Sequence, residues 1–297
     1  MNIWAASSVV ERCPDKTEVI GSIPMPPTPN IHFLLTATRK TEVEGSIPSA
    51  PTLNPHLYMR DPKIIYEDKN FLAIDKPAGL LVHPVRSKNF ESKEATLVDW
   101  LLAHYPQVKN VGDDPEFRPG IVHRLDRETS GIMLAALNQE YFLYLKSLFQ
   151  ERHIKKTYLA LVEGDVFLKE GAIEKAIRIK KGTVKRTVYH GRNEKEAKTL
   201  YGVIKHLPGI SLLEVTPLTG RTHQIRVHLQ SIGHPICGDT LYAPKDKARK
   251  WDRLMLHAHS LEFIPEDGKA VRLEAETPPE FLKIIHTPDT GQGVNML

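Results

Sequence analysis

Short runs of apolar residues, separated by polar turn residues, cover the chain from about residue 60 onward and predict more strands than helices. A hairpin is predicted over 64–75, with its turn at 68–70. The unbroken apolar run 131–137 indicates a strand buried on both faces. Further strands are predicted at 158–163, 172–179, 197–205, 211–216 and 254–263.

Three segments instead repeat their apolar residues at helical spacing. Thr96 is expected to cap a helix over 97–104, and Asn138 a helix that runs to about residue 152. A third helix is predicted over 222–232, with Thr222 as its cap. Because these helices interrupt the strands irregularly, the pattern predicts an α+β fold with a mixed, mostly antiparallel central sheet and flanking helices.

The first 56 residues differ from the rest of the chain. They hold 8 of the 22 prolines and show little apolar periodicity, and proline opposes both helix and sheet. A near-repeat, 17–24 and 41–48, occurs only twice, which is too few copies for a repeat architecture. We therefore expect 1–56 to be a disordered proline-rich extension and 57–290 to form the folded domain. A linear motif for a partner is the alternative for the extension.

Composition and charge are those of a soluble globular protein, with 41% hydrophobic and 26% charged residues. The formal net charge of +4 permits a polyanionic partner. No apolar run reaches the roughly 18–20 residues that a bilayer span needs, and the N-terminus does not resemble a secretory signal. Cys13 and Cys237 are too few for a disulfide framework, so a reducing cytoplasm is the expected location.

The 14 histidines raise the question of a metal site, but their spacing does not support one. His223 and His228 are five residues apart, whereas ligands on one helix face are four apart. His257 and His259 share a strand face and have no further ligand near them in sequence. The sequence has no glycine-rich loop of the kind that binds NAD or nucleoside triphosphates. Ser130 does not lie in the Gly-x-Ser-x-Gly motif that marks the nucleophile of many hydrolases. The sequence therefore predicts no metal and no cofactor.

The segment 118–131 is the first that carries chemistry. It precedes a buried strand, a place where loop residues are both fixed and accessible. Asp126 is the acid of its sequence His123-Arg124-Leu125-Asp126. Two interpretations stand for this segment alone: a functional carboxylate, or an acid that caps a turn or pairs with Arg124.

Two further segments hold candidate residues. Arg221 would lie at the start of the helix predicted over 222–232, where a carboxylate or phosphate is favoured. Its alternative is an exposed ion pair of little energetic weight. Tyr158 opens a predicted strand and could place its ring against a base or a sugar. Taken alone, that tyrosine is better explained as a core aromatic.

Together these segments resemble the RluA-type pseudouridine synthases. His123-Arg124-Leu125-Asp126, followed by Thr129-Ser130-Gly131, is similar to the signature of that family. Four other stretches resemble its remaining motifs in family order: 70–79, 156–160, 219–226 with 233–239, and 256–258. The resemblance covers residues from about 64 to 263.

The resemblance implies a pseudouridine synthase-like fold with a catalytic cleft, so that 57–290 would be a catalytic domain. It implies that Asp126 is the catalytic aspartate, Tyr158 the active-site tyrosine and Arg221 the ion-pair partner of Asp126. Leu256 would be an apolar contact under the base, and Arg124 would fill the gap that the target nucleotide leaves. His123 and Thr129 are assigned to substrate binding beside them.

The expected reaction is the isomerisation of uridine to pseudouridine in structured RNA, by covalent attack of a carboxylate on the sugar or on the base. The target base must leave its stack, and phosphate contacts would hold the RNA. The candidates for those contacts lie around the Gly182 turn. For any single lysine among them, the simpler explanation is that it lies at a solvated hairpin tip and binds nothing. They are Lys180, Lys181, Lys185 and Arg186.

The expected partner is RNA, with ribosomal RNA favoured over transfer RNA, and the expected form is a cytoplasmic monomer without a membrane or obligatory protein partner. The main alternative is a non-catalytic RNA-binding protein on the same fold. A hydrolase that uses Asp126 as nucleophile is a second alternative, but it would need a water-activating base or a metal.

Overall fold

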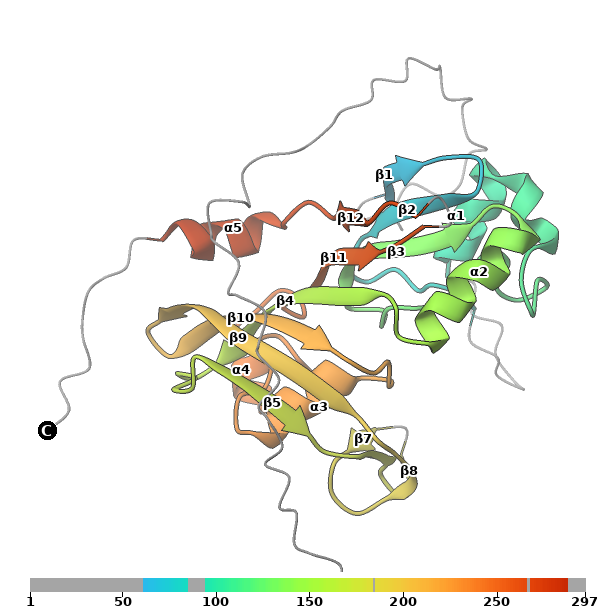
Figure 1. The fold of residues 1–297 in the computed structure, drawn as a ribbon. Coiled ribbons are helices and arrows are strands. Elements are labelled where there is room, and N and C mark those ends of the chain that lie inside the picture. The colour runs from blue at the N-terminus through green and yellow to red at the C-terminus, as the bar shows by residue number, and fades with distance from the viewer. Residues whose placement is uncertain (1–60, 85–93, 184, 266–267, 288–297) are drawn as a thin grey trace, which may run out of the picture. The chain divides into compact units, whose positions relative to one another are not determined.

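The alternating runs of the sequence form a long, mixed sheet in the computed structural model (Figure 1). The structure describes residues 61–84, 94–183, 185–265 and 268–287, so the predicted extension 1–56 lies outside the described residues. Nine strands of the described part belong to this sheet. They are β1 (Lys63–Glu67), β2 (Phe71–Lys76), β3 (Ser130–Ala136), β4 (Lys155–Glu163), β5 (Glu170–Glu174), β9 (Lys198–Leu207), β10 (Ile210–Pro217), β11 (Leu256–Phe263) and β12 (Val271–Glu274).

The strand order is β1-β2-β3-β11-β4-β10-β9-β5, and β12 pairs with β11. Neighbouring strands of this sheet pair antiparallel, except β3 and β11, which run parallel. Gly131 makes this parallel contact sterically possible. Its φ is 114°, and a Cβ at that position would collide with the backbone carbonyl of Ala258. The predicted mixed, mostly antiparallel sheet is therefore confirmed.

The helices begin where the sequence supplies capping side chains. The Thr96 hydroxyl accepts a hydrogen bond from the Asp99 backbone N–H, and the Asp99 carboxylate accepts one from the Thr96 N–H, which completes a capping box. The Asn138 side chain accepts from the Tyr141 N–H in the same way. The helices are α1 (Leu97–His104), α2 (Gln139–Gln150), α3 (Gln224–Ser231), α4 (Lys245–Ala248), α5 (Pro279–His286) and the 3-10 helix η2 (Pro106–Asn110).

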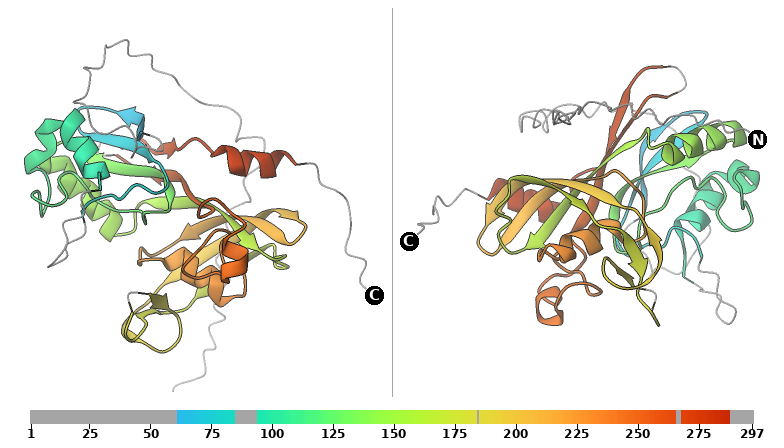
Figure 2. Two further views of the ribbon diagram at one scale, coloured as in Figure 1. Left: turned by 180° about the vertical axis from the view of Figure 1, so that it is seen from behind. Right: turned by 60° about the horizontal axis from the view of Figure 1, so that its bottom comes forward.

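Buried side chains form two hydrophobic clusters, one in each half of the sheet. The first joins β2 and β3 to α1 and α2, and the second joins β4 and β10 to α3 and to Phe281 of α5. Figure 1 shows α1 and α2 beside the β1–β3 end, and Figure 2 shows α3, α4 and α5 gathered around the other end. Tyr158 packs against both clusters, so the middle of the sheet is where the two halves meet.

The strand predicted over 172–179 is in fact two strands in two different sheets. β5 ends at Glu174, and β6 (Ile177–Ile179) begins a separate three-stranded sheet with β7 (Arg186–Thr187) and β8 (Arg192–Lys195). Apolar residues on both sides of Glu174 and Lys175 suggested one strand, but the chain changes partner between the two pieces. No helix within the described ranges is long and apolar enough to cross a membrane.

Candidate active site

Asp126 lies in the loop that leads into β3, and the backbone of that loop is held on both sides. The Thr129 N–H donates to the carbonyl of Asp126 at 3.1 Å, which closes a turn directly after the carboxylate. The neighbouring Leu125 is 5% exposed and packs in the first hydrophobic cluster. Thr129 itself is 2% exposed, so it shapes the turn from inside the protein. Asp126 keeps 19% of its side chain exposed, whereas Glu128 in the same turn is 49% exposed and lies 3.7 Å from Arg127.

The end of β2 and the segment after it hold the Asp126 loop through hydrogen bonds to its backbone. Lys76 is fully buried, and its ammonium donates to the carbonyls of Pro77, Leu80 and Arg127 at 2.8, 2.9 and 3.1 Å. Gly79 and Arg127 exchange two more hydrogen bonds, of 2.9 and 3.0 Å. Burial lowers the pKa of Lys76 to about 7, and the carboxylates of Glu128 and Asp126 oppose this shift.

Arg226 of α3 is the cation that faces Asp126. One of its Nη atoms lies 3.3 Å from Oδ2 of Asp126. Its remaining donors form a bidentate pair with Asp239, with two bonds of 2.8 Å. Burial alone would lower the pKa of Arg226, but hydrogen bonding and charge from Asp239, together with Asp126, raise it. The guanidinium is 7% exposed and the Asp239 carboxylate 0%, so this is a buried, geometrically fixed charge.

The prediction that Arg221 pairs with Asp126 is therefore wrong. Among the described residues, the ionic partners of Asp126 are Arg226 and, at 3.8 Å, His223. Arg221 directs its Nε to the backbone carbonyl of Glu196 at 3.1 Å, and its own N–H donates to the Gln224 side chain. Both arginines lie in one motif, but α3 turns the second of them toward the aspartate.

The start of α3 also differs from the prediction, because His223 and not Thr222 occupies the cap position. His223 has a φ of 56°, which is uncommon for a residue with a side chain and costs about 1–2 kcal/mol. The turn places its ring between Asp126 and Tyr242, whose hydroxyl lies 2.8 Å from Nδ1. Burial lowers the pKa of His223, while the charge of Asp126 opposes that shift.

Tyr158 and Leu256 lie on the neighbouring strands β4 and β11, and Tyr158 is near enough to Asp126 to feel its charge. Ala258 is opposite Tyr158 and Leu256 is opposite Ala160, so the side chains of Tyr158 and Leu256 point to the same face of the sheet. Leu256 is 3% exposed. Burial, followed by the negative charge of Asp126, raises the pKa of the Tyr158 phenol. Tyr158 is therefore neutral at physiological pH and lies within electrostatic reach of the carboxylate.

His123 is turned away from this group, contrary to its predicted place in substrate binding. Its Nε2 accepts the backbone N–H of Leu134 at 2.9 Å, and its ring stacks on Phe149 with centroids 4.2 Å apart. Burial lowers the pKa of His123 to about 3, so the ring is neutral. His123 anchors the Asp126 loop to β3. Arg124, by contrast, is exposed and donates to His83 at 3.2 Å.

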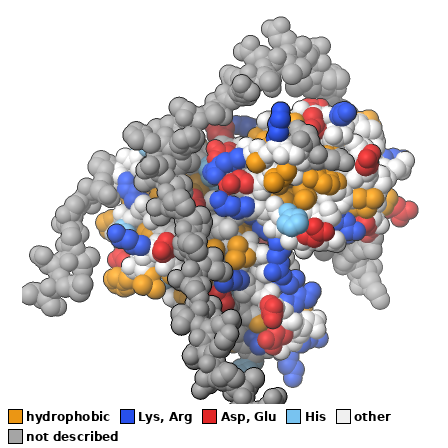
Figure 3. Space-filling view, in the orientation of Figure 1, with side chains coloured by type: hydrophobic (Ala, Val, Ile, Leu, Met, Phe, Trp, Pro, Cys, Tyr) orange, Lys and Arg blue, Asp and Glu red, His pale blue; other side chains and the backbone are white. Residues whose placement is uncertain are grey.

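The predicted phosphate contacts divide into two exposed and two half-buried residues. Lys180 and Lys181 are exposed at the turn after β6. Lys185 donates to the carbonyl of Leu241, and the Arg186 N–H donates to the hydroxyl of Tyr242. This hydroxyl also contacts His223, so the basic hairpin joins the edge of the Asp126 site. Figure 3 shows Lys and Arg side chains gathered on the part of the visible face that carries this small sheet.

The arrangement supplies an accessible carboxylate, a buried cation that stabilises its charged form, and a neutral phenol beside an apolar leucine. This set suits a carboxylate that attacks a flat, largely apolar substrate. Within the described residues, no group of three or more His, Cys, Asp or Glu side chains could hold a metal ion.

Four site residues were not identified from the sequence as parts of this group: Arg226, Asp239, His223 and Tyr242. Arg226, Asp239 and His223 were visible only as members of family-like motifs, and His223 had in addition been considered and rejected as a metal ligand. Tyr242 carried no sequence signal, although its ring lies under the Arg226 guanidinium at 5.2 Å. Their roles depend on contacts between segments far apart in sequence.

Comparisons with known proteins agree with this geometry. The family model described as RNA pseudouridylate synthase matches residues 70–231. An "Uncharacterized RNA pseudouridine synthase" of Aquifex aeolicus is 42% identical over 232 residues, which cover 74% of this chain and 71% of that protein. The "Ribosomal large subunit pseudouridine synthase D" of Borreliella burgdorferi is 36% identical over 219 residues, which cover 74% of this chain and 66% of that protein. The chain thus spans about two thirds of the length of these relatives.

A solved structure shares the fold. "Human RNA Pseudouridylate Synthase Domain Containing 1" matches with a TM-score of 0.61 at 29% identity, over 76% of this chain and 86% of that one.

Proposed function

Since the chain belongs to the RNA pseudouridylate synthase family, we propose that it isomerises uridine to pseudouridine in structured RNA, with Asp126 as the nucleophile. The observation that carries this proposal is the Asp126–Arg226–Asp239 chain beside Tyr158 and Leu256. The reaction breaks the bond between the sugar and the uracil nitrogen, rotates the uracil, and joins a ring carbon to the same sugar carbon. Product and substrate have the same atoms, so the site must supply only a nucleophile, a binding surface and proton transfer.

Asp126 forms a transient covalent bond, with the sugar or with the base, and so divides the isomerisation into two steps. The nucleophile is the carboxylate anion of Asp126, and Arg226 supplies the opposite charge beside it. A guanidinium suits this place because it stays charged when buried. The bidentate bond to Asp239 fixes the direction of Arg226, and one Nη remains for Asp126.

Tyr158 and Leu256 form the surface on which the uracil rests. Leucine offers an apolar contact, and the tyrosine ring offers a face for stacking. The raised pKa of the phenol keeps Tyr158 protonated at neutral pH. A protonated phenol can accept a proton from the sugar only if it gives up its own proton at the same time. An oxygen of the base or of the sugar can receive that proton.

The target uridine reaches this site after it leaves its stack, at a cost of a few kcal/mol that is smallest in a loop. Arg124, exposed two residues before Asp126, fills the gap left by the nucleotide. Lys180, Lys181 and the adjoining Lys185 and Arg186 contact the phosphates of the same strand.

We favour ribosomal RNA as the substrate. The named relatives of known assignment are ribosomal large subunit enzymes, at 35–38% identity. A cytoplasmic location and a monomeric state complete the proposal, in line with RNA as the partner. The non-catalytic alternative has no support in these comparisons, and the ion pair between Asp126 and Arg226 supports the catalytic proposal.

The deciding experiment maps pseudouridine, by mass spectrometry or chemical modification, in bulk ribosomal and transfer RNA incubated with the purified protein. New pseudouridine in ribosomal RNA, absent with the Asp126→Asn variant, is the expected result. Binding of RNA without product would favour the non-catalytic RNA-binding alternative. Product in transfer RNA alone would overturn the substrate assignment but keep the reaction.

A further inference from the structure

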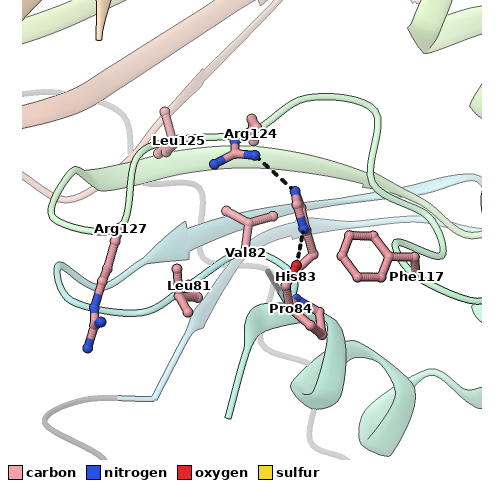
Figure 4. A pocket seen from close by; sticks show the side chains of 8 residues that line it. All are labelled: Leu81, Val82, His83, Pro84, Phe117, Arg124, Leu125 and Arg127. Atoms are coloured by element: carbon pink, nitrogen blue, oxygen red, sulfur yellow. Dashed lines mark hydrogen bonds between the residues drawn. The ribbon is translucent and has the colours of Figure 1, made fainter. Parts of the chain in front are cut away.

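A hollow of about 310 Å³ lies on the side of the Asp126 loop that faces the segment after β2. Its volume is at the lower end of the roughly 300–1,000 Å³ of small-molecule sites. Figure 4 shows Leu81, Val82, His83 and Pro84 along one side, with Arg124 and Leu125 above them and Phe117 beside His83. Arg127 lines its other end.

This hollow is separate from the surface proposed for the target uracil. Asp126, Tyr158 and Leu256 are not among its lining residues. The two places are nevertheless adjacent, because Arg124 is two residues from Asp126 and the chain between them spans at most about 7 Å. A strand that delivers its uridine to Asp126 brings the neighbouring nucleotide to within reach of the hollow.

The walls suit a flat aromatic ligand. Val82 and Leu125 are 4% and 5% exposed and form an apolar floor. The rings of His83 and Phe117 lie with centroids 5.1 Å apart at an angle of 56°. A nucleobase has two apolar faces and a polar edge, and aromatic side chains bind such faces with little regard to base identity.

The polar groups at the rim of the hollow suit the phosphate and the polar base edge of a nucleotide. His83 Nδ1 lies 2.8 Å from the carbonyl of Pro84, so Nδ1 carries the proton of the neutral ring and Nε2 accepts from Arg124 at 3.2 Å. Burial, with the charges of Arg124 and Arg118, lowers the pKa of His83 and keeps this arrangement at neutral pH. The guanidinium of Arg124 is thus held at the rim, where it complements a phosphate or a base oxygen.

We infer that this hollow binds the nucleobase next to the target uridine, held against Phe117 and His83, with Arg124 between the two nucleotides. The inference rests on the proposed function, because it takes the RNA strand at Asp126 as its starting point. The hollow then acts as a second recognition site, which holds the strand in its unstacked form while the uridine reacts.

The test measures binding of a stem–loop RNA whose loop carries a single-stranded uridine, with one flanking nucleotide at a time made abasic. Any stem–loop of this kind can serve as the probe. The preferred probe is the loop whose uridine is converted in the pseudouridine mapping experiment. The protein is the full chain in the Asp126→Asn form, so that binding is read without turnover. Phe117→Leu keeps apolar bulk but removes the aromatic face, Phe117→Trp restores one, and Phe167→Ala is a control at a phenylalanine that is 87% exposed.

We expect the abasic change at one flanking position to weaken RNA binding about tenfold in three proteins. These are the Asp126→Asn protein with Phe117 retained, its Phe117→Trp form and its Phe167→Ala control. The same change should have little effect with Phe117→Leu, because the stacking partner is already lost. Equal effects of the abasic change on all four proteins, at both flanking positions, would overturn the inference. If Phe117→Leu fails to fold, Phe117→Met, which also keeps apolar bulk without an aromatic ring, takes its place and should likewise lose the tenfold difference.

Pseudouridine formation by the unaltered protein, measured in parallel, separates this inference from the proposed function. Product without any dependence on a flanking base would remove the hollow as a binding site and leave the reaction intact. A dependence on one flanking base without product would support the hollow and count against the isomerase.

Discussion

Two positively charged regions of the described residues, Arg226 and the turn that holds Lys180 and Lys181, differ in how the structure surrounds them. Arg226 is 7% exposed, and its guanidinium bonds to the carboxylates of Asp239 and Asp126. Lys180 and Lys181 are exposed at a turn of the small sheet and form no ion pair with another described residue. The first charge is fixed in direction, whereas the second can follow a flexible phosphate chain.

The difference follows from the physics of each environment. A buried cation needs partners, because removing one of them leaves an uncompensated charge in a medium of low polarity. An exposed lysine needs none, and its attraction to phosphate is long-ranged and weakened by salt. We therefore expect Arg226 to control the chemical step and fold stability, and the lysines to control binding.

The largest effect on activity is expected from a change at Asp126. Asp126→Asn should remove detectable pseudouridine formation, because an amide cannot act as the nucleophile, and should leave RNA affinity within about threefold. Single-turnover assays and filter binding measure the two quantities. Retained turnover would exclude Asp126 as the nucleophile.

The second comparison replaces each arginine of the 219–226 motif by lysine. Arg226→Lys keeps the charge but loses the bidentate fork, so turnover should fall about 100-fold and the free energy of unfolding by about 3 kcal/mol. Arg221→Lys is the matched control, since Arg221 contacts a backbone carbonyl and not Asp126. Single-turnover rates and urea denaturation report both effects. Equal losses in the two variants would contradict the assignment of the ion pair to Arg226.

The exposed lysines should show the reverse pattern. The double variant Lys180→Gln with Lys181→Gln should weaken RNA binding about tenfold at low salt and reduce the slope of log affinity against log salt by roughly 0.7–0.9 for each lost phosphate contact. The rate at saturating RNA should stay the same. Lys109→Gln, at an exposed lysine outside this hairpin, is the control. An unchanged salt slope would show that the hairpin does not contact phosphate.

The smallest effect on activity is expected from buried histidines, which instead influence stability at acid pH. Burial lowers the pKa of His123 and of His257 to about 3, whereas an unfolded histidine has a pKa of about 6.5. Between these values the unfolded chain binds more protons than the folded one, so the free energy of unfolding falls as pH falls. From pH 7 to pH 5 the loss should be about 1–2 kcal/mol for each histidine. Urea denaturation at both pH values measures it.

The control for this pH dependence is His123→Gln, whose side-chain oxygen can still accept the Leu134 N–H. The variant should lose part of the difference in stability between pH 7 and pH 5. A difference equal to that of the unaltered protein would mean that His123 is protonated in the folded state.

Local sequence signals were sufficient where the physics is local. The caps Thr96 and Asn138 place α1 and α2 correctly, because each cap bonds a backbone N–H three residues away. The buried strand at 131–137 was identified from its unbroken apolar run and became β3, all of whose residues are buried. The end of β5 was missed because the change of sheet after Glu174 depends on distant strands.

The site was only partly predictable for the same reason. Asp126, Tyr158 and Leu256 were identified from motifs, and the structure brings them to one region of the sheet. The choice between Arg221 and Arg226 could not be made from a motif that contains both. It depends on where α3 begins, and His223 starts that helix in a left-handed conformation that neither pattern nor propensity predicts.

The sequence by itself determined the class of fold, the helix caps, the buried strand and the acid that would carry the chemistry, because each depends on residue type and short-range spacing. The tertiary structure decided which arginine faces that acid, that His123 supports the loop from inside, and that His83, Phe117 and Arg124 enclose a hollow beside it. These depend on side chains separated by up to 100 residues, such as Asp126 and Arg226. Burial and directed hydrogen bonds select among such pairs only after the chain has folded.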